Sequence, residues 1–365
     1  MRRIGVTGGH GFLGWHLRVL ARSRGDIDLQ VLDRETCDSE VALARAIDGC
    51  ERVVHLAGAN RGVSDDVNRG NVGPAQVLAE AVRRCERPPL VAFANSSQCG
   101  NGSAYGTAKL QALDALRSAG SPIESGVLDA RLPNLFGEHG RPFYNSVVAT
   151  FSHQLARGEQ PTVLQDRSLD LTHANTAATL LLDAAPEPDA VSPLASSHTV
   201  TELLATLSSF AAIYGRAEIP PLPDQFSVDL FNTYRSFCPP LVRGLPLQRH
   251  TDGRGSLVEA VKAHGSSGQC FFSTSHPGVT RGQHYHLRKV ERFLVLEGEA
   301  LISLRRACYD EVVSHRVSGV EPVAVDMPTM WVHNITNVGP GPLLTLFWTN
   351  DLFDPAAPDT YAESV

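Results

Sequence analysis

Tyr105 and Lys109 lie four positions apart, at the start of a predicted helix that follows a predicted strand. On a helix, residues i and i+4 share one face, so the two side chains can meet at one site. A free tyrosine has a pKa near ~10, and a neighbouring ammonium lowers that pKa toward the working range. The pair therefore predicts proton transfer to a ketone oxygen during reduction, and the alternative is an exposed helix start.

A glycine-rich turn, Thr7-Gly-Gly-His-Gly-Phe-Leu-Gly14, separates the first predicted strand from the first predicted helix. Glycines at positions 8, 11 and 14 permit a tight turn, a close approach of the backbone to a diphosphate, and close packing of helix on strand. The helix N-terminus then offers N–H groups and a positive dipole to the phosphates. The turn predicts dinucleotide binding, and the alternative is an ordinary glycine-rich turn.

The spacing of these glycines is similar to that of extended short-chain dehydrogenases/reductases, whose members modify sugar nucleotides. His55-Leu-Ala-Gly58, the Tyr105 and Lys109 pair, and Arg131-Leu-Pro-Asn-Leu-Phe-Gly137 match further elements of that family. The resemblance implies a catalytic set of Ser96, Tyr105 and Lys109, with Ser96 binding the carbonyl oxygen. It also implies an NAD(P) site formed by Gly8, His10, Gly11, Phe12, Leu13, Gly14, Arg34, Leu56, Ala57, Gly58, Tyr105, Lys109, Pro133 and Asn134.

Asp33 and Arg34, after the second predicted strand, give opposite indications about the cofactor. An acid at this place suits the ribose hydroxyls of NAD, whereas an arginine suits the 2′-phosphate of NADP. A third interpretation of Arg34 is a solvated loop charge.

Histidines and a glutamate form a second cluster, within Gly278-Val-Thr-Arg-Gly-Gln-His-Tyr-His-Leu-Arg-Lys-Val-Glu-Arg-Phe-Leu-Val-Leu-Glu-Gly298. This segment matches the first cupin motif, and residues 328–337 resemble the second, with Met330 in place of its glycine. His284 and His286 share one face of a strand, and Glu291 and His333 can meet them from neighbouring strands. Three imidazoles and a carboxylate suit zinc or another divalent ion. Some related sugar epimerases bind no metal.

Apolar periodicity divides the chain into two parts. The first alternates strands and helices, which predicts a parallel, doubly wound Rossmann-like sheet. Its predicted strands are 4–7, 29–32, 52–57 and 90–94, and its predicted helices are 12–21, 41–47, 74–84 and 105–116. The second part predicts an all-β cupin jelly-roll barrel. Its predicted strands are 256–261, 269–273, 283–286, 292–296, 300–305, 311–317, 323–326 and 343–348. We place the boundary between residues 243 and 244.

Composition restricts the classes of function. The chain has 365 residues, 42% of them hydrophobic, and a formal net charge of −7, which gives no reason to expect a nucleic-acid or membrane partner. The apolar run at residues 4–6 is too short for a signal peptide. The seven cysteines form no C-x-x-C pair, which is typical of free thiols in a reducing cytoplasm.

Over its whole length the sequence resembles the family of the capsular polysaccharide assembling protein CapF. Segments that carry this resemblance include Tyr144-Asn-Ser-Val-Val-Ala-Thr-Phe151 and the tail Phe353-Asp-Pro-Ala-Ala-Pro-Asp-Thr-Tyr361, which no general rule of folding demands. The resemblance implies a dimeric, bifunctional, cytoplasmic enzyme acting on a UDP-linked keto sugar. Its cupin domain epimerises C3 of a UDP-2-acetamido-2,6-dideoxy-4-hexulose, and its reductase domain reduces the C4 ketone with NADPH to UDP-N-acetyl-6-deoxy-L-talosamine.

Three questions stay open at this stage. The base that removes the C3 proton is either Lys289 or Tyr285, and strand alternation turns Tyr285 away from His284 and His286. The metal is either catalytic or a structural brace. The same domain plan also suits another nucleotide sugar, or a single reductase whose cupin serves only for dimerisation.

Overall fold

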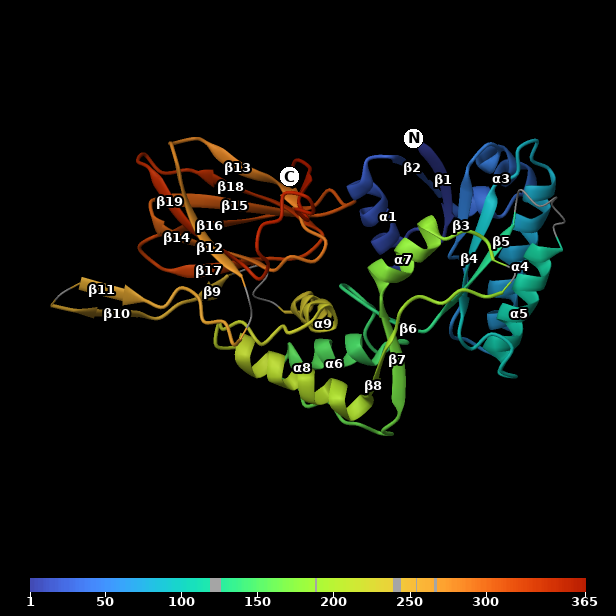
Figure 1. The fold of residues 1–365 in the computed structure, drawn as a ribbon, viewed down its shortest axis with the longest axis horizontal. Helices are drawn as coiled ribbons and strands as arrows, with labels where there is room; N and C mark the ends of the chain where they lie inside the picture. The colour runs from blue at the N-terminus through green and yellow to red at the C-terminus, as the bar shows by residue number, and fades with distance from the viewer. Residues whose placement is uncertain (119–125, 188, 239–243, 254, 266–267) are drawn as a thin grey trace. The chain divides into compact units, whose positions relative to one another are not determined.

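The computed structural model describes residues 1–118, 126–187, 189–238, 244–253, 255–265 and 268–365 (Figure 1). The chain divides into two compact units. The first comprises Met1–Leu135 with Leu169–His198, and the second comprises Phe136–Ser168 with Thr199–Val365.

A parallel sheet forms the centre of the first unit. Its strand order is β2-β1-β3-β4-β5, and each neighbouring pair runs parallel. The strands are β1 (Arg2–Thr7), β2 (Ile27–Leu32), β3 (Arg52–His55), β4 (Leu90–Ser96) and β5 (Val127–Leu132). The order reverses between β1 and β3, and ligands of such sheets bind beyond the carboxyl ends of the strands at this switch point. The predicted strands here are confirmed to within a few residues.

Helices cover both faces of this sheet, as Figure 1 shows. They are α1 (Phe12–Arg24), α2 (Arg34–Cys37), α3 (Glu40–Ile47), α4 (Ser64–Arg83), α5 (Ala104–Arg117) and α7 (Ala174–Asp183). Helices α3, α4 and α5 form one core with the sheet, which includes Leu43, Leu78, Phe93 and Leu113. A strand buried on both faces can be apolar throughout, which is why the short runs at β1 and β3 were recognisable.

Helix α4 differs from the prediction, which began a helix at Pro74. The helix begins at Ser64, and Pro74 lies inside it. Proline is most common in the first turn of a helix, so its place inside α4 is unusual. The exposed polar residues of the first turns hide the amphipathic pattern of the earlier part of the helix.

The middle of the chain contains elements that the sequence analysis did not assign. A small sheet has the order β6-β7-β8, with β6 (Asn134–Phe136), β7 (Ser168–His173) and β8 (Ser196–Thr199). Helices α6 (Val147–Leu155), α8 (Val200–Tyr214) and α9 (Gln225–Arg235) belong to the second unit. Within the ranges that the structure describes, no helix is both long and apolar enough to cross a bilayer.

Two antiparallel five-stranded sheets make up the rest of the second unit, with the orders β12-β19-β14-β17-β9 and β16-β15-β18-β13-β20. They enclose a core that includes Phe293, Ile302, Ile335 and Phe347. The strands are β9 (Leu245–Pro246), β12 (Gln269–Ser275), β13 (Thr280–Tyr285), β14 (Glu291–Glu297), β15 (Glu299–Arg306), β16 (Val312–Ser318), β17 (Val323–Met327), β18 (Trp331–Asn337), β19 (Leu343–Thr349) and β20 (Tyr361–Ala362). A separate hairpin pairs β10 (Arg249–Asp252) with β11 (Gly255–Val258).

Helix α9 bonds to the backbone of these sheets. The buried Arg235 donates to Met327 O at 3.2 Å, and Asn232 donates to Arg288 O at 2.8 Å. The predicted boundary between residues 243 and 244 therefore falls inside the second compact unit. Residues 239–243 lie outside the described part of the chain.

A buried ion pair joins β14 to β17. Arg292 donates to both carboxylate oxygens of Asp326, at 2.6 and 2.9 Å, and also to Ala217 O at 2.6 Å. Burial opposes ionisation of Asp326, but the charge and hydrogen bonds of Arg292 outweigh it and hold the pKa of the carboxyl below its ordinary value.

We predict that Arg292→Met destabilises the protein by about 3–5 kcal/mol, because it leaves a buried carboxylate unpaired. The matched control is Arg316→Met, which breaks an exposed pair with Glu299 and costs less than about 1 kcal/mol. Denaturant unfolding measures both. Because the native pKa of Asp326 is lowered, the contribution of this pair is present at neutral pH and disappears as the pH falls through that native pKa. Equal losses for the two variants would contradict the assignment.

Candidate functional site

The turn between β1 and α1 has the geometry that its glycines predict. Gly8 has φ +69°, and a Cβ there would lie 2.8 Å from Ala57 N. A Cβ at Gly14 would lie 2.6 Å from Gly8 O, so only glycine lets the helix approach the turn. The loop after β3, which contains Leu56 and Ala57, is thereby packed directly against the turn.

Gly11 is the N-cap of α1, and a Cβ there would meet only Gly8 O, at 3.4 Å. A glycine has no side chain to cap the helix, so the first-turn N–H groups of Phe12 and Leu13 are available to an anion. His10 and Gly11 are exposed at this turn. The backbone therefore fits the diphosphate of a dinucleotide.

Helix α5 brings Tyr105 and Lys109 to one place. Ser103 caps the helix by accepting a hydrogen bond from Gly106 N at 3.0 Å, and this sets the start of the helix. Lys109 Nζ lies 5.9 Å from the centroid of the Tyr105 ring. It donates to Ala94 O on β4 at 3.0 Å, two residues before Ser96. The three predicted catalytic residues thus lie around the carboxyl end of β4.

Burial lowers the pKa of Lys109 to about 8, and nearby Cys99 and Asp129 partly oppose this effect. The ammonium is therefore retained at neutral pH. His55, at the end of β3, is held neutral, because burial and then the charge of Lys109 lower its pKa to about 3. Its Nδ1 forms a 2.8 Å hydrogen bond with Thr7 Oγ1. A Cβ at Gly58 would lie 3.6 Å from Lys109 Nζ, so the glycine leaves room beside the ammonium.

A buried polar network beneath Ser96 was not found from the sequence. Asn95 donates to Asp129 at 2.6 Å and accepts from Ser96 N at 2.9 Å. Arg131, from the predicted family segment, donates to the other oxygen of Asp129 at 2.8 Å. The network joins β4 to β5, and no local sequence pattern signals a pairing across two strands.

The remaining predicted cofactor residues lie at strand ends. Asn134 begins β6 and donates to Asp170 O at 3.2 Å, and Pro133 precedes it. Arg34 begins α2, its side chain 95% exposed. The carboxylate of Asp33 caps the same helix by accepting from Thr36 N at 2.7 Å, and this bond lowers its pKa. Asp33 is therefore committed to the helix, whereas Arg34 extends into solvent.

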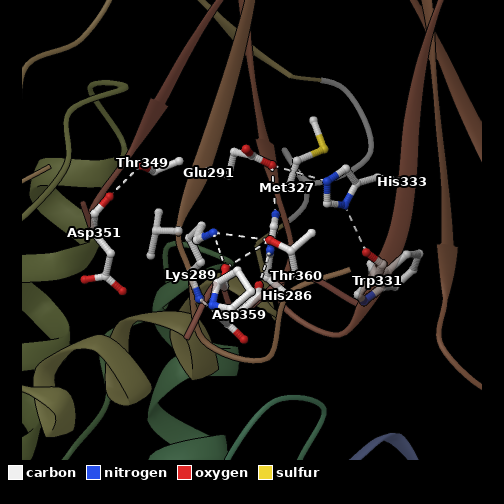
Figure 2. Close-up of polar contacts among 12 residues, drawn as sticks. His286, Lys289, Glu291, Met327, Trp331, His333, Thr349, Asp351, Asp359 and Thr360 are labelled. Carbon is white, nitrogen blue, oxygen red and sulfur yellow. Dashed lines mark hydrogen bonds and ion pairs between the residues drawn. The ribbon is translucent and has the colours of Figure 1, made fainter. Parts of the chain in front are cut away.

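The four predicted metal ligands come together in the second unit, as Figure 2 shows for three of them. Each of the four offers a ligand atom, and these atoms all lie within 4.8 Å of one another. His284 lies on β13 opposite His333 on β18, His286 follows β13, and Glu291 begins β14. His284 and His286 point the same way because they are two residues apart in extended chain, and the other two ligands come from neighbouring strands.

Backbone carbonyls fix the orientation of two of the rings. His286 Nδ1 lies 2.6 Å from Asp359 O, and His333 Nδ1 lies 3.0 Å from Trp331 O. The Nε2 atoms of both rings approach Glu291 Oε2, at 3.1 and 3.2 Å. His333 Nε2 has no hydrogen bond to any residue that the structure describes.

A neutral imidazole has one N–H, and the carbonyls take it on Nδ1. The Nε2 lone pairs then face a carboxylate, so acceptor meets acceptor. A divalent cation among them resolves this conflict, and the donor set therefore fits a metal.

The charges of this cluster agree with metal ligation. Burial, followed by the nearby His333 and His286, lowers the pKa of His284 to about 4, so the ring is a neutral donor at neutral pH. Burial opposes ionisation of Glu291, but the neighbouring His286 and His333 side chains outweigh it and hold the pKa of the carboxyl below its usual range. Metal ligands bind in the deprotonated form, and the pKa values of His284 and Glu291 are both lowered in that direction.

A pocket of about 270 Å³ opens over the cluster. Its polar lining includes Arg281, Lys289 and Asp351, and its apolar wall includes Phe271 and Phe347, whose rings stack at 4.9 Å. Tyr285, the other candidate base, is 1% exposed and packs against Tyr361, and it does not line this pocket.

Met330, which replaces the glycine of the second motif, keeps the turn that a glycine would make. Its φ is +60°, and its N–H donates to His286 O at 2.6 Å. A side chain in this conformation is strained, and the complete burial of Met330 holds it there. The replacement therefore leaves His333 in its predicted position.

Comparisons with known families match both parts of the chain. Residues 4–195 match the NAD dependent epimerase/dehydratase family, and residues 250–361 match the polysaccharide biosynthesis C-terminal domain. The chain is 34% identical over 372 residues to the UDP-2-acetamido-2,6-beta-L-arabino-hexul-4-ose reductase of Pseudomonas aeruginosa, covering 100% of this chain and 99% of that protein. The spore coat polysaccharide biosynthesis protein SpsL of Bacillus subtilis is 26% identical over 122 residues, which are 31% of this chain and 81% of SpsL.

Solved structures agree with the predicted architecture. The capsular polysaccharide assembling protein CapF from Staphylococcus aureus is 30% identical with a TM-score of 0.59, and 100% of each chain is covered. CapF with the inhibitor 3-isopropenyl-tropolone is 32% identical with a TM-score of 0.57 at the same coverage. The UDP-glucose 4-epimerase of Thermotoga maritima, 18% identical with a TM-score of 0.50 over 57% of this chain and 82% of its own, shares the fold alone. A Rossmann-like parallel sheet followed by a β domain like the cupin of CapF is thus confirmed.

Proposed function

Since the chain belongs to the NAD dependent epimerase/dehydratase family and to the family of CapF, we propose that it is a bifunctional nucleotide-sugar enzyme. Its barrel epimerises C3 of a UDP-2-acetamido-2,6-dideoxy-4-hexulose. Its first unit then reduces the C4 ketone with NADPH, and the product is UDP-N-acetyl-6-deoxy-L-talosamine. The observation that carries the proposal is the presence of two complete constellations in one chain, each in its own unit.

The order of the two steps follows from the chemistry of the ketone. The C4 carbonyl makes the C3–H acidic, because the electron pair left at C3 is delocalised as an enolate. Once C4 is an alcohol, that acidity is lost, so epimerisation comes first. The enolate is then reprotonated on the opposite face of C3, and no net proton is gained or lost.

In the first unit, Tyr105 gives its hydroxyl proton to the C4 oxygen while Ser96 binds that oxygen. Lys109 favours the tyrosinate that this transfer leaves, and its ammonium is held beside the ring by Ala94 O. Bound NADPH supplies the hydride that reaches C4. The glycine turn at Gly8–Gly14 binds the diphosphate of the cofactor, as the packing around Gly14 supports.

In the second unit, His284, His286, Glu291 and His333 hold a divalent metal, for which zinc suits the donor set. A metal held by these residues would supply positive charge at the base of the pocket, which would either favour formation of the enolate or stabilise the barrel. Of the two candidate bases, Lys289 is the one that lines the pocket. Arg281 lies at the same pocket and suits a diphosphate.

Two alternatives keep parts of this scheme. The enzyme can act on another nucleotide-linked 4-keto sugar, which parallel assays with different sugar nucleotides decide. The barrel can instead be a non-catalytic dimerisation module, and the exchange experiment below decides between that role and epimerisation. A homodimer in the cytoplasm is the assembly and location that we propose.

Exchange in heavy water tests the epimerase. We predict that the intact protein, without NADPH, introduces deuterium at C3 of the 4-keto substrate. His284→Ala combined with His286→Ala should abolish the exchange and leave reduction of the pre-epimerised ketone intact. The matched control is His250→Ala, on an exposed strand, which should exchange normally. Exchange that persists in the folded, metal-free double variant would show that the metal is only structural. No exchange with intact protein would contradict the proposed epimerase activity.

Removing the proton donor tests the reductase. We predict that Tyr105→Phe lowers oxidation of NADPH by two orders of magnitude or more, on the order of the usual contribution of general-acid catalysis. Cofactor fluorescence provides the control, because binding of NADPH should persist. Unchanged turnover in a folded preparation would overturn the role of Tyr105.

The exposed arginine at α2 tests the cofactor. We predict that Arg34→Ala weakens NADPH much more than NADH, because only NADPH carries a 2′-phosphate. Arg34→Lys keeps the charge and should preserve most of the preference. Titration of each cofactor by fluorescence measures this, and an equal loss for both cofactors would show that Arg34 does not contact the phosphate.

A further inference from the structure

The tail Phe353–Tyr361 is a feature that the proposed chemistry does not use. Its last residues return to the barrel, where β20 pairs with β13 through Tyr361 and Tyr285. The pairing places Asp359, two residues before Tyr361, beside His286, which follows β13.

Asp359 organises the loop that links two of the proposed metal ligands. Its carboxylate accepts three backbone hydrogen bonds, from Leu287 N at 3.0 Å, Arg288 N at 3.1 Å and Lys289 N at 2.9 Å. These residues connect His286 to the strand that begins at Glu291. Successive N–H groups that converge on one carboxylate fix the path of a loop, so the spacing of the two ligands depends on this side chain.

The backbone of the same residue contacts a ligand directly. Asp359 O lies 2.6 Å from His286 Nδ1, so Nδ1 donates a hydrogen bond to this carbonyl and Nε2 is the ring atom that points toward Glu291 (Figure 2). The φ of Asp359 is +42°, a conformation that aspartate and asparagine adopt more readily than most residues. Asp359 is itself buried.

The neighbours of Asp359 reinforce this arrangement. Lys289 Nζ donates to Pro358 O at 2.8 Å and to Thr360 Oγ1 at 3.4 Å. Three consecutive tail residues therefore hold the loop between the ligands, and two of them hold a side chain that lines the pocket. A tail that served only to anchor the chain end would not need to contact this loop by both backbone and side chain.

We infer that Asp359 is a positioning residue for the metal, because it fixes the tautomer of His286 through its carbonyl and the loop to Glu291 through its carboxylate. The inference rests on the proposed metal site. It assigns a purpose to a tail sequence that folding rules alone do not explain. Hydrogen-bond partners of metal-ligating histidines typically contribute 10- to 100-fold in metal affinity, roughly the effect expected here.

Two substitutions alter the carboxylate contact and keep the carbonyl contact. Asp359→Gly keeps the positive φ and the carbonyl but removes the carboxylate. Asp359→Asn also keeps the backbone and one acceptor oxygen, but its NH₂ group opposes a backbone N–H. The matched control is Asp354→Asn in the same tail, where the carboxylate accepts from Ala356 N at 2.8 Å.

Cobalt(II) is the probe, added to the full-length, metal-stripped proteins. We expect wild type and Asp354→Asn to bind one Co²⁺ with the same visible spectrum. Both Asp359 variants should bind it roughly 10- to 100-fold more weakly, with a changed ligand-field spectrum, and the glycine variant should lose more. Circular dichroism establishes that each variant is folded, and Asp359→Asn supports the comparison where the glycine variant fails to fold.

The outcomes separate the inference from the proposed function. If wild type binds Co²⁺ and the folded Asp359 variants match its affinity and spectrum, Asp359 only anchors the tail and the inference fails. If wild type itself binds no Co²⁺, the metal site of the proposed function fails and the inference falls with it.

Discussion

A carboxylate buried among imidazoles is the constraint on which the second unit depends. Glu291 is 6% exposed, and His286 and His333 both turn Nε2 toward it. A buried charge without compensation costs several kcal/mol, roughly, so the fold must supply a partner. The carbonyls that orient the two rings contribute to the environment of Glu291. The strained turn at Met330 also contributes. A bound cation would compensate the charge of Glu291, whereas apolar side chains in its place would not.

The first unit solves a similar problem with the opposite charge. Lys109 is 4% exposed, and its ammonium is satisfied by Ala94 O and lies over the ring of Phe93 at 4.7 Å. The nearby Asp129 is in turn held by Asn95 and Arg131. In each unit, the candidate site thus holds a buried ionised group in place with residues at strand ends. The two sites suit the two proposed reactions, and the acidity of the C3–H requires that epimerisation precede reduction.

Local spacing explains what the sequence could predict. Tyr105 and Lys109, and His284 and His286, are related by the repeat of a helix or a strand, so their convergence follows from local geometry. Asp359 lies 73 residues from His286 in the chain, and its role depends on pairing that no local pattern reveals. The same holds for Asn95 and Asp129. The helix predicted from Pro74 begins at Ser64 in the structure, because the exposed polar residues of its first turns hide the amphipathic pattern.

The proposed sequence of reactions is tested most directly by the configuration of the product. Intact protein is incubated with the UDP-linked 4-keto sugar and NADPH, and the purified product is analysed by proton NMR and mass spectrometry. The account predicts a sugar that is two mass units heavier, roughly the gain of one hydride and one proton, with C3 inverted and C4 reduced to an alcohol. A product reduced at C4 with its original configuration at C3 would contradict it.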